Sequence, residues 1–225
     1  MIICTSISPN HKNYDSQAAA LASWQKYGEC FSLNNEWELP ETVMEQYQGI
    51  TFIPTRKTIQ HLVGKSLVTI NAFYDFAIER KRDLFLINSD IIVKDLPKLK
   101  QDGITIFSRY DFTDSIGETK MFIHGYDAFY IPYQFLKMFP PSIFALGACW
   151  HDLWTPYCCI KNQIPVYYPN GEFTFHKLHE VQYPVRDWEL LGRFFQLEFG
   201  FDYNISVGQV NTQAMATISN HLLKY

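Results

Sequence analysis

The sequence has no excess of basic charge, no paired cysteines and no long hydrophobic run. Its formal net charge of −4 provides no positive field for sequence-independent binding, so we expect no nucleic-acid partner. None of its apolar runs approaches the ~20 residues of a transmembrane helix. Residues 1–8 lack the basic start and the apolar core of a signal peptide. We therefore expect a cytoplasmic protein with no transmembrane segment.

Five cysteines are present, an odd number without a C-x-x-C pair. This pattern argues against a disulfide framework and against a structural zinc site. We expect buried free thiols, which favours a reducing compartment.

Short apolar runs alternate with helical patterns over the first ~95 residues, as in α/β proteins. This alternation predicts a mixed, mainly parallel sheet that is flanked by helices, with nucleotide chemistry at the carboxyl ends of the strands. Strands are expected at 2–7, 30–33, 51–53, 84–87 and 91–93, and helices near 15–28, 40–47 and 65–79.

The second half of the chain is less regular. It still fits one α/β domain over residues 1–203, followed by a C-terminal accessory segment of helical appearance over residues 204–225. The patterns predict strands at 104–108, 128–131 and 165–168 and helices at 133–138, 150–161 and 187–199.

A polar triplet, Asn88-Ser89-Asp90, separates two apolar runs. A carboxylate at a strand end can hold a hard divalent ion, which in turn neutralises a diphosphate. Since Asn, Ser and Asp also favour turns, an ordinary strand-end turn is the alternative.

Two histidines occur at i and i+3 in His176-Lys177-Leu178-His179. This spacing allows both imidazoles to share a metal ion. It also arises by chance, and a polar surface turn remains the alternative. His176 follows an apolar run at 173–175, so we expect it at a strand end.

An acid lies between two tryptophans in Trp150-His151-Asp152-Leu153-Trp154. Tryptophan rings pack well on sugars, and a carboxylate beside them can act as a general base. The alternative is a helix in which Asp152 is a cap and Trp150 and Trp154 pack in the core.

Basic residues are expected near a helix N-terminus, where cations can help to hold phosphate. Arg56 precedes Gly64-Lys65, which begins the helix expected at 65–79. Solvated surface charges are the alternative for Arg56 and Lys65.

Taken in order, these segments resemble a glycosyltransferase family of the GT-A type. The run 86–92 is similar to a strand that ends in a DxD-like N-x-D-I motif, and 125–132 to a D-x-F-x-x-P segment that begins at Asp127. Gly147 with Trp150–Trp154 is similar to G-x-x-x-W-D-x-W, with His151 as an added residue, and 176–179 matches an H-x-x-H motif. The match spans roughly residues 2–183, and it departs from the family pattern at Asn88, where an aspartate is expected.

The resemblance implies a Rossmann-like GT-A domain that uses a nucleotide-sugar and a divalent metal, Mn²⁺ or Mg²⁺. It implies a UDP- or GDP-sugar donor, and a glycan, protein or small molecule as the unknown acceptor. Asp152 is the expected catalytic base if the transfer inverts, whereas a retaining transfer would not need this base. The residues expected at the donor are Thr5, Ser6, Arg56, Lys65, Asn88, Ser89 and Asp90, those at the acceptor Asp127, Trp150 and Trp154, and those at the metal Asp90, His176 and His179.

Two other functions stay open at this point. Asn88 and the lone acid Asp90 also fit a catalytically silent module of the same fold that binds nucleotide or glycan. A metal-dependent hydrolase would instead use His176, His179 and the acids Asp127 and Asp152. Turnover of a nucleotide-sugar would distinguish the glycosyltransferase from the silent module and from the hydrolase.

Overall fold

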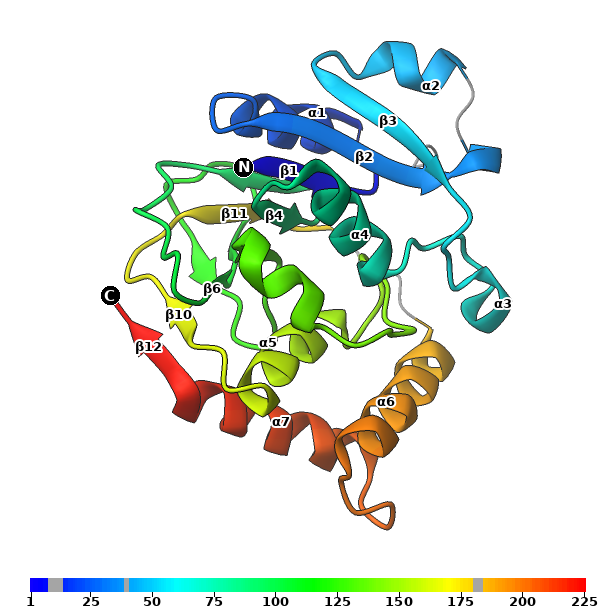
Figure 1. The fold of residues 1–225 in the computed structure, drawn as a ribbon. Helices are drawn as coiled ribbons and strands as arrows, with labels where there is room; N and C mark the ends of the chain where they lie inside the picture. The colour runs from blue at the N-terminus through cyan, green and yellow to red at the C-terminus, as the bar shows by residue number, and fades with distance from the viewer. Residues whose placement is uncertain (8–13, 39–40, 180–183) are drawn as a thin grey trace.

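The computed structural model describes residues 1–7, 14–38, 41–179 and 184–225, and the side chains of 41–43 lie outside this description. An eight-stranded sheet forms its centre, with strand order β12-β10-β6-β9-β4-β1-β2-β3 (Figure 1). The strands are β1 (Ile2–Thr5), β2 (Glu29–Asn35), β3 (Ile50–Thr55), β4 (Leu84–Ile87), β6 (Ile104–Phe107), β9 (Ala128–Ile131), β10 (Val166–Tyr168) and β12 (Leu222–Lys224).

Neighbouring strands of this sheet are parallel except where β9 pairs with β4 and β6. β1, β4, β6 and β9 are buried along their whole length, because helices or loops cover both faces. The predicted fold class is therefore confirmed: one α/β domain with a mixed, mainly parallel sheet that helices flank.

A second sheet grows from the carboxyl edge of the first. It has the order β5-β11-β7-β8, and β5 and β7 follow directly after the polar ends of β4 and β6. Its strands are β5 (Ile91–Val93), β7 (Tyr110–Phe112), β8 (Lys120–Met121) and β11 (Thr174–Lys177). This small sheet places late residues of the chain beside the carboxyl ends of β4 and β6.

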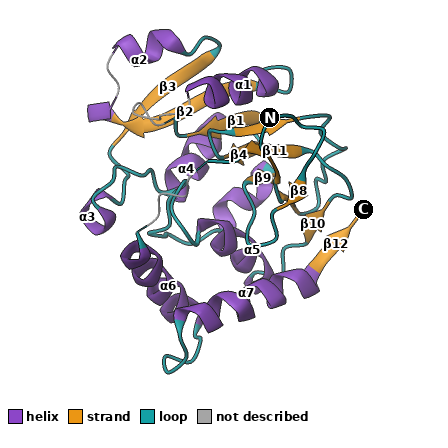
Figure 2. Cartoon of the chain, turned by 180° about the vertical axis from the view of Figure 1, so that it is seen from behind, coloured by secondary structure: helices purple, strands orange, loops and turns teal. Residues whose placement is uncertain are grey.

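Helices cover the two faces of the central sheet unequally (Figure 2). One hydrophobic cluster packs α4 (Ile70–Arg80), α5 (His151–Lys161), α6 (Val185–Phe199) and α7 (Val207–His221) on one face, and a second packs α1 (Tyr14–Trp24) on the other. The shorter helices are α2 (Glu41–Gln46), α3 (Gln60–Val63) and the 3₁₀ segments η1 (Glu36–Glu38) and η2 (Tyr133–Met138).

The helix expected from residue 65 begins only at Ile70. Gly64 caps the carboxyl end of α3 with a φ of 72°, a left-handed conformation that suits glycine. Residues 65–69 then run across to two isolated bridges, Thr58 with Val68 and Thr69 with Ala145. Lys65 therefore follows a helix instead of beginning one, which corrects the prediction of a phosphate-binding helix N-terminus there.

The C-terminal segment is an integral part of the domain. β12 pairs in parallel with β10 at the edge of the central sheet. The buried side chains Val207, Val210, Ala214 and Ile218 place α7 in the larger core. Residues 204–225, expected as an accessory segment, thus complete both the sheet and the core.

The helices that the structure describes are all too short or too polar to cross a membrane. Four of the five cysteine side chains are buried, and Cys149 is partly exposed.

Candidate functional site

The three residues predicted to bind metal lie together at the carboxyl edge of β4. Asp90 lies in the turn between β4 and β5, His176 is inside β11, and His179 follows that strand. One possible ligand atom from each lies within 4.8 Å of the other two. The prediction that His176 lies at a strand end needs a small correction, since β11 continues through Lys177.

The spacing of these atoms fits a divalent ion. Asp90 Oδ2 lies 3.1 Å from His179 Nε2 and 3.5 Å from His176 Nε2. Ligands that bind one ion at about 2.1 Å from adjacent positions are about 3 Å apart, and from opposite positions about 4.2 Å apart. The carboxylate and the two imidazoles therefore lie near enough to one another to bind a single ion after small movements.

A hydrogen-bonded network extends from the histidines into residues that the sequence reading missed. His176 Nδ1 lies 2.9 Å from Asp111 Oδ1, and Arg109 Nε donates to the same oxygen at 2.8 Å. Arg109 Nη1 lies 3.2 Å from Asp127 Oδ1. Arg109 and Asp111 follow the buried strand β6 in the way that Asn88 and Asp90 follow β4, so the same signal in the sequence could have found them.

Asp127, predicted at the acceptor, is held by this network. Its side chain is buried and accepts from Asn88 Nδ2 at 2.7 Å as well as from Arg109. Asn88 therefore joins the end of β4 to the start of β9. Its own Oδ1 atom is buried with no hydrogen-bond partner among the described residues.

The charges of the cluster favour a cation once its two histidines are neutral, as imidazoles that bind a metal must be. Burial alone would raise the pKa of Asp90, but hydrogen bonds from His176 and His179, together with their charges, hold it well below its usual range. Burial also opposes the charge of Arg109, whereas Asp127 and Asp111 raise its pKa, so the guanidinium stays charged. One arginine thus faces three carboxylates at positions 90, 111 and 127.

Asp152 lies in the first turn of α5, apart from the hydrogen-bonded network. Desolvation raises the pKa of its carboxyl to about 6; the nearby negative charge of Asp127 adds to this effect, whereas His151 lowers it. A Cβ atom on Gly125 would lie 1.9 Å from Asp152 Oδ2, so the carboxyl packs directly against this glycine. Gly125 contacts Asp152, and Asp127, two residues further on, belongs to the hydrogen-bonded network. This short stretch of chain therefore connects Asp152 to the metal-binding cluster.

The two tryptophans beside Asp152 face the core. Trp150 is 2% exposed and Trp154 is completely buried. Trp150 Nε1 donates to the carbonyl oxygen of Trp188 at 2.9 Å, and Trp154 Nε1 donates to Glu198 at 2.7 Å. Both rings are anchored by α6 and do not form an open wall for a sugar, which corrects the prediction of Trp150 and Trp154 at the acceptor.

The predicted donor residues at the end of β1 lie beside the end of β4. Cys4 pairs in register with Leu86 in the parallel strand β4, so Thr5 and Ser6 continue toward the same edge of the sheet as residues 87 and 88. Thr5 is buried, and its Oγ1 has no hydrogen-bond partner among the described residues. Ser89 Oγ accepts from Gln17 Nε2 at 2.9 Å, which ties the triplet to α1.

Arg56 and Lys65 do not join this cluster. Arg56 follows β3, three strands from β4, which corresponds to about 14 Å across the sheet. It pairs with Glu36 at 2.8 Å, and its side chain is 80% exposed. Lys65 lies close enough to Cys149 for its positive charge to act on this thiol. Burial raises the pKa of Cys149 to about 12, and the charge of Lys65 opposes this rise.

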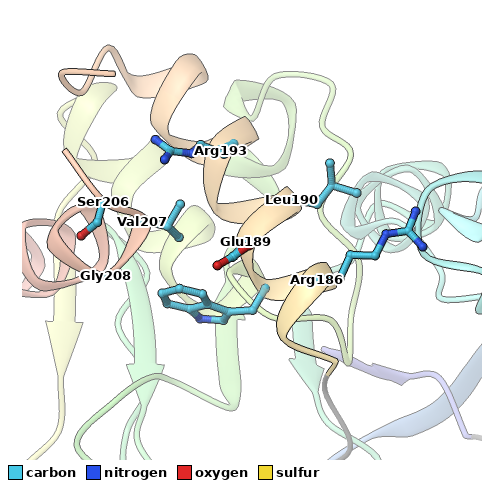
Figure 3. Close-up of a pocket in the computed structure, with 8 residues that line it drawn as sticks. Arg186, Glu189, Leu190, Arg193, Ser206, Val207 and Gly208 are labelled. Atoms are coloured by element: carbon cyan, nitrogen blue, oxygen red, sulfur yellow. The ribbon is translucent and has the colours of Figure 1, made fainter. Parts of the chain in front are cut away.

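A separate pocket of about 380 Å³ lies between α6 and the start of α7 (Figure 3). None of the predicted site residues lines it. Arg193 lines it, but its guanidinium already donates to Gln196 and to the carbonyl oxygens of Tyr203 and Ile205. The lining residues are Arg186, Trp188, Glu189, Leu190, Arg193, Ser206, Val207 and Gly208.

No protein-family model and no curated protein matches the sequence. One similar solved structure is the galactosyltransferase LgtC in complex with donor and acceptor sugar analogues, with a TM-score of 0.35 and 13% identity over 64% of this chain. The match spans 61% of the length of that enzyme. Another is a glycosyltransferase involved in glycosylation of the major capsid of PBCV-1, with a TM-score of 0.34 and 10% identity over 96% of this chain and 98% of the other. At these TM-scores neither likeness carries an argument about function.

Proposed function

We propose that this protein is a glycosyltransferase that moves a sugar from a nucleotide-sugar to an acceptor hydroxyl with the help of a divalent metal ion. The observation that carries the proposal is the meeting of Asp90, His176 and His179 at the carboxyl edge of β4. Ligands of α/β sheets bind at this edge. The buried cysteines are our ground for expecting the protein in the cytoplasm.

The donor would lie across the ends of β1 and β4. Thr5 and Asn88 each have a buried oxygen without a hydrogen-bond partner among the described residues, and Ser6 follows Thr5 at the end of β1, the strand parallel to β4. The Thr5 hydroxyl can donate to or accept from a polar ligand, whereas Asn88 Oδ1 can only accept. We propose that they contact the nucleotide of a UDP- or GDP-sugar.

Asp90, His176 and His179 would hold Mn²⁺ or Mg²⁺ beside the diphosphate. When bound, such an ion supplies positive charge that stabilises the leaving nucleoside diphosphate. Arg109 is already paired with two carboxylates, so it is not available to take over this task. The protein groups themselves orient the ion and the donor.

Asp152 would act as the general base of an inverting transfer. Its pKa of about 6 leaves the carboxyl ionised at neutral pH and basic enough to accept the proton of an acceptor hydroxyl. Its oxygen would take this proton while the hydroxyl attacks the anomeric carbon and the bond to the diphosphate breaks.

The test is a screen of UDP- and GDP-sugars in the presence of Mn²⁺. Thermal shift measures binding, since a ligand at 100 times its Kd stabilises by roughly 2.7 kcal/mol. Release of UDP or GDP, in the presence of mono- and disaccharide acceptors, measures turnover. The proposal fails if the protein binds no nucleotide-sugar, or if Mn²⁺ changes neither binding nor turnover.

One observation favours a catalytically silent binding module as a second candidate. Asn88 stands where the family pattern has an aspartate, and its amide donates to Asp127. Because Asn88 is not an acid, the triplet offers only one carboxylate to a metal. Binding of a nucleotide-sugar without release of UDP or GDP would support this reading. A metal-dependent hydrolase would need Asp127 as one of its acids, but the carboxylate of Asp127 already accepts hydrogen bonds from Arg109 and Asn88.

A further inference from the structure

We propose that Asp111 is a positioning residue for the metal ligand His176, and that Arg109 holds Asp111 in place. This inference rests on the metal-binding part of the proposed function. Asp111 would not contact the ion; it would fix the orientation of the imidazole and select the nitrogen that binds.

The first step concerns the protonation of His176. Its Nδ1 lies 2.9 Å from Asp111 Oδ1, and an ionised carboxylate can only accept a hydrogen bond. Nδ1 therefore carries a proton. Nε2 faces Asp90 Oδ2 at 3.5 Å and is the nitrogen left to bind a metal ion once its own proton is released. A carboxylate behind a ligating histidine fixes the ring and makes the other nitrogen a stronger donor to a metal.

The second step concerns the rigidity of the pair. β7 and β11 are parallel, and Asp111 and His176 are partners in the register, so their side chains emerge on the same side of the small sheet. Both are largely buried, with side-chain exposures of 14% and 5%. The hydrogen bond between them is thus built into the pairing of two strands.

The third step concerns Arg109. Its Nε donates to Asp111 and its Nη1 to Asp127, and its guanidinium lies 4.0 Å from the centre of the Phe122 ring. The side chain is only 17% exposed. Because the planar fork is fixed on two carboxylates, it leaves Asp111 Oδ1 oriented toward His176.

The experiment measures Mn²⁺ affinity by isothermal titration calorimetry, with far-UV circular dichroism as the check on folding. We expect Asp111→Ala to weaken Mn²⁺ binding by about 10- to 100-fold. Asp111→Asn keeps an acceptor oxygen for Nδ1 and should restore part of this loss. Asp114→Asn, which changes an exposed acid three residues further on, is the matched control and should bind like the parent.

A double-mutant cycle separates positioning from direct ligation. In a His176→Gln background, Asp111→Ala should change the remaining Mn²⁺ affinity by less than about twofold, because its only route to the ion is gone. An equal loss in both backgrounds would show that Asp111 is itself a ligand, or that it acts through the fold, and would overturn the proposal. Unchanged affinity of Asp111→Ala would also overturn it.

Failure of the metal site itself gives a different result. If the parent protein binds no Mn²⁺, the metal-dependent function and the positioning role fall together. If the parent binds and all Asp111 variants bind equally well, only the positioning role falls.

Discussion

Asp90 and Asp152 are both acids in largely buried surroundings, but the two surroundings shift the carboxyl pKa in opposite directions. Around Asp90, two histidines hold the pKa well below its usual range in spite of burial. Around Asp152, the charge of His151 and hydrogen bonds from the backbone amides of Asp152 and Leu153 offset desolvation only in part, and the pKa rises to about 6. The comparison teaches that burial alone does not decide the role of an acid. A carboxylate that stays ionised suits a cation, whereas one with a raised pKa suits proton transfer.

Removal of the first carboxylate should have the largest effect. We expect Asp90→Ala to weaken Mn²⁺ binding by more than about 100-fold, since a direct ligand contributes more than the residues behind it. Calorimetric titration with MnCl₂ measures this loss, and binding of UDP or GDP should lose its dependence on Mn²⁺. Circular dichroism should show the parent fold. If Asp90→Ala bound Mn²⁺ and nucleotide like the parent, the cluster would not be the metal site.

Replacement of the second carboxylate should spare binding and remove chemistry. We expect Asp152→Asn to lower kcat by about 100-fold or more while Mn²⁺ and nucleotide-sugar still bind, because the amide cannot accept a proton. In the parent, kcat/KM should fall about tenfold per unit as the pH drops below the pKa of about 6, since protonation removes the base.

Asp187→Asn is the matched control for Asp152→Asn, because Asp187 is the acid in the first turn of α6. It should leave kcat and the pH profile unchanged. A kcat of Asp152→Asn within a few-fold of the parent would make Asp152 a structural residue and would remove the argument for inversion.

A change at Gly125 should disturb Asp152 without touching the metal ligands. The new Cβ of Gly125→Ala would lie 1.9 Å from Asp152 Oδ2, so the carboxyl must move. We expect kcat to fall by about tenfold and stability to fall by about 1–3 kcal/mol, as in other overpacked sites. Mn²⁺ affinity should stay within about twofold of the parent.

Gly117→Ala is the control here, because its Cβ would meet only Ser115 Oγ at 3.6 Å. Steady-state kinetics and thermal unfolding of both variants make the comparison. An equal loss in the two variants would mean that the loop, and not the contact with Asp152, is responsible.

The smallest expected effect is a gain of stability in Asp152→Asn. A raised folded-state pKa means that the folded protein binds the proton more tightly than the unfolded chain does, so the ionised acid costs stability as pH rises from 3.8 through about 6. The amide removes this cost. The full shift corresponds to about 3 kcal/mol. We expect about 1–2 kcal/mol of it as extra stability at pH 7, because the amide accepts weaker hydrogen bonds than the carboxylate from the backbone amides of Asp152 and Leu153. We expect no gain near pH 4, and urea unfolding at both values measures the difference. A loss at pH 7 would indicate a capping role instead.

The regular parts of the fold could be predicted because local patterns specify them. The alternation of apolar runs and helical spacing over the first half led to the correct fold class. The short strands β7 and β8 were missed, since strands of three and two residues carry almost no periodicity. The start of α4 was placed too early because residues 65–69 are held by bridges to Thr58 and Ala145, which are distant contacts.

The metal-binding part of the candidate site could be predicted from local patterns, whereas the acceptor part could not. Asp90, His176 and His179 stand at strand ends or in a recognisable motif, and the structure brings them together. Trp150 and Trp154 were assigned to the acceptor because a tryptophan in a core and one in a sugar site look alike in sequence. Their partners, Trp188 and Glu198, lie about 40 residues further on in α6, so no local pattern could decide between the two.

The register of the small sheet has a consequence for how this protein can vary. His176 is the partner of Ile91 in β5 and of Asp111 in β7. Successive side chains of a strand point to opposite faces. One inserted or deleted residue between 174 and 176 would therefore turn the imidazole of His176 away from Asp90 and Asp111. Changes of length in the connections outside the paired strands leave this register untouched. We therefore expect homologous chains to differ in loop length around the cluster, and insertion libraries of this gene to be depleted within β5, β7 and β11.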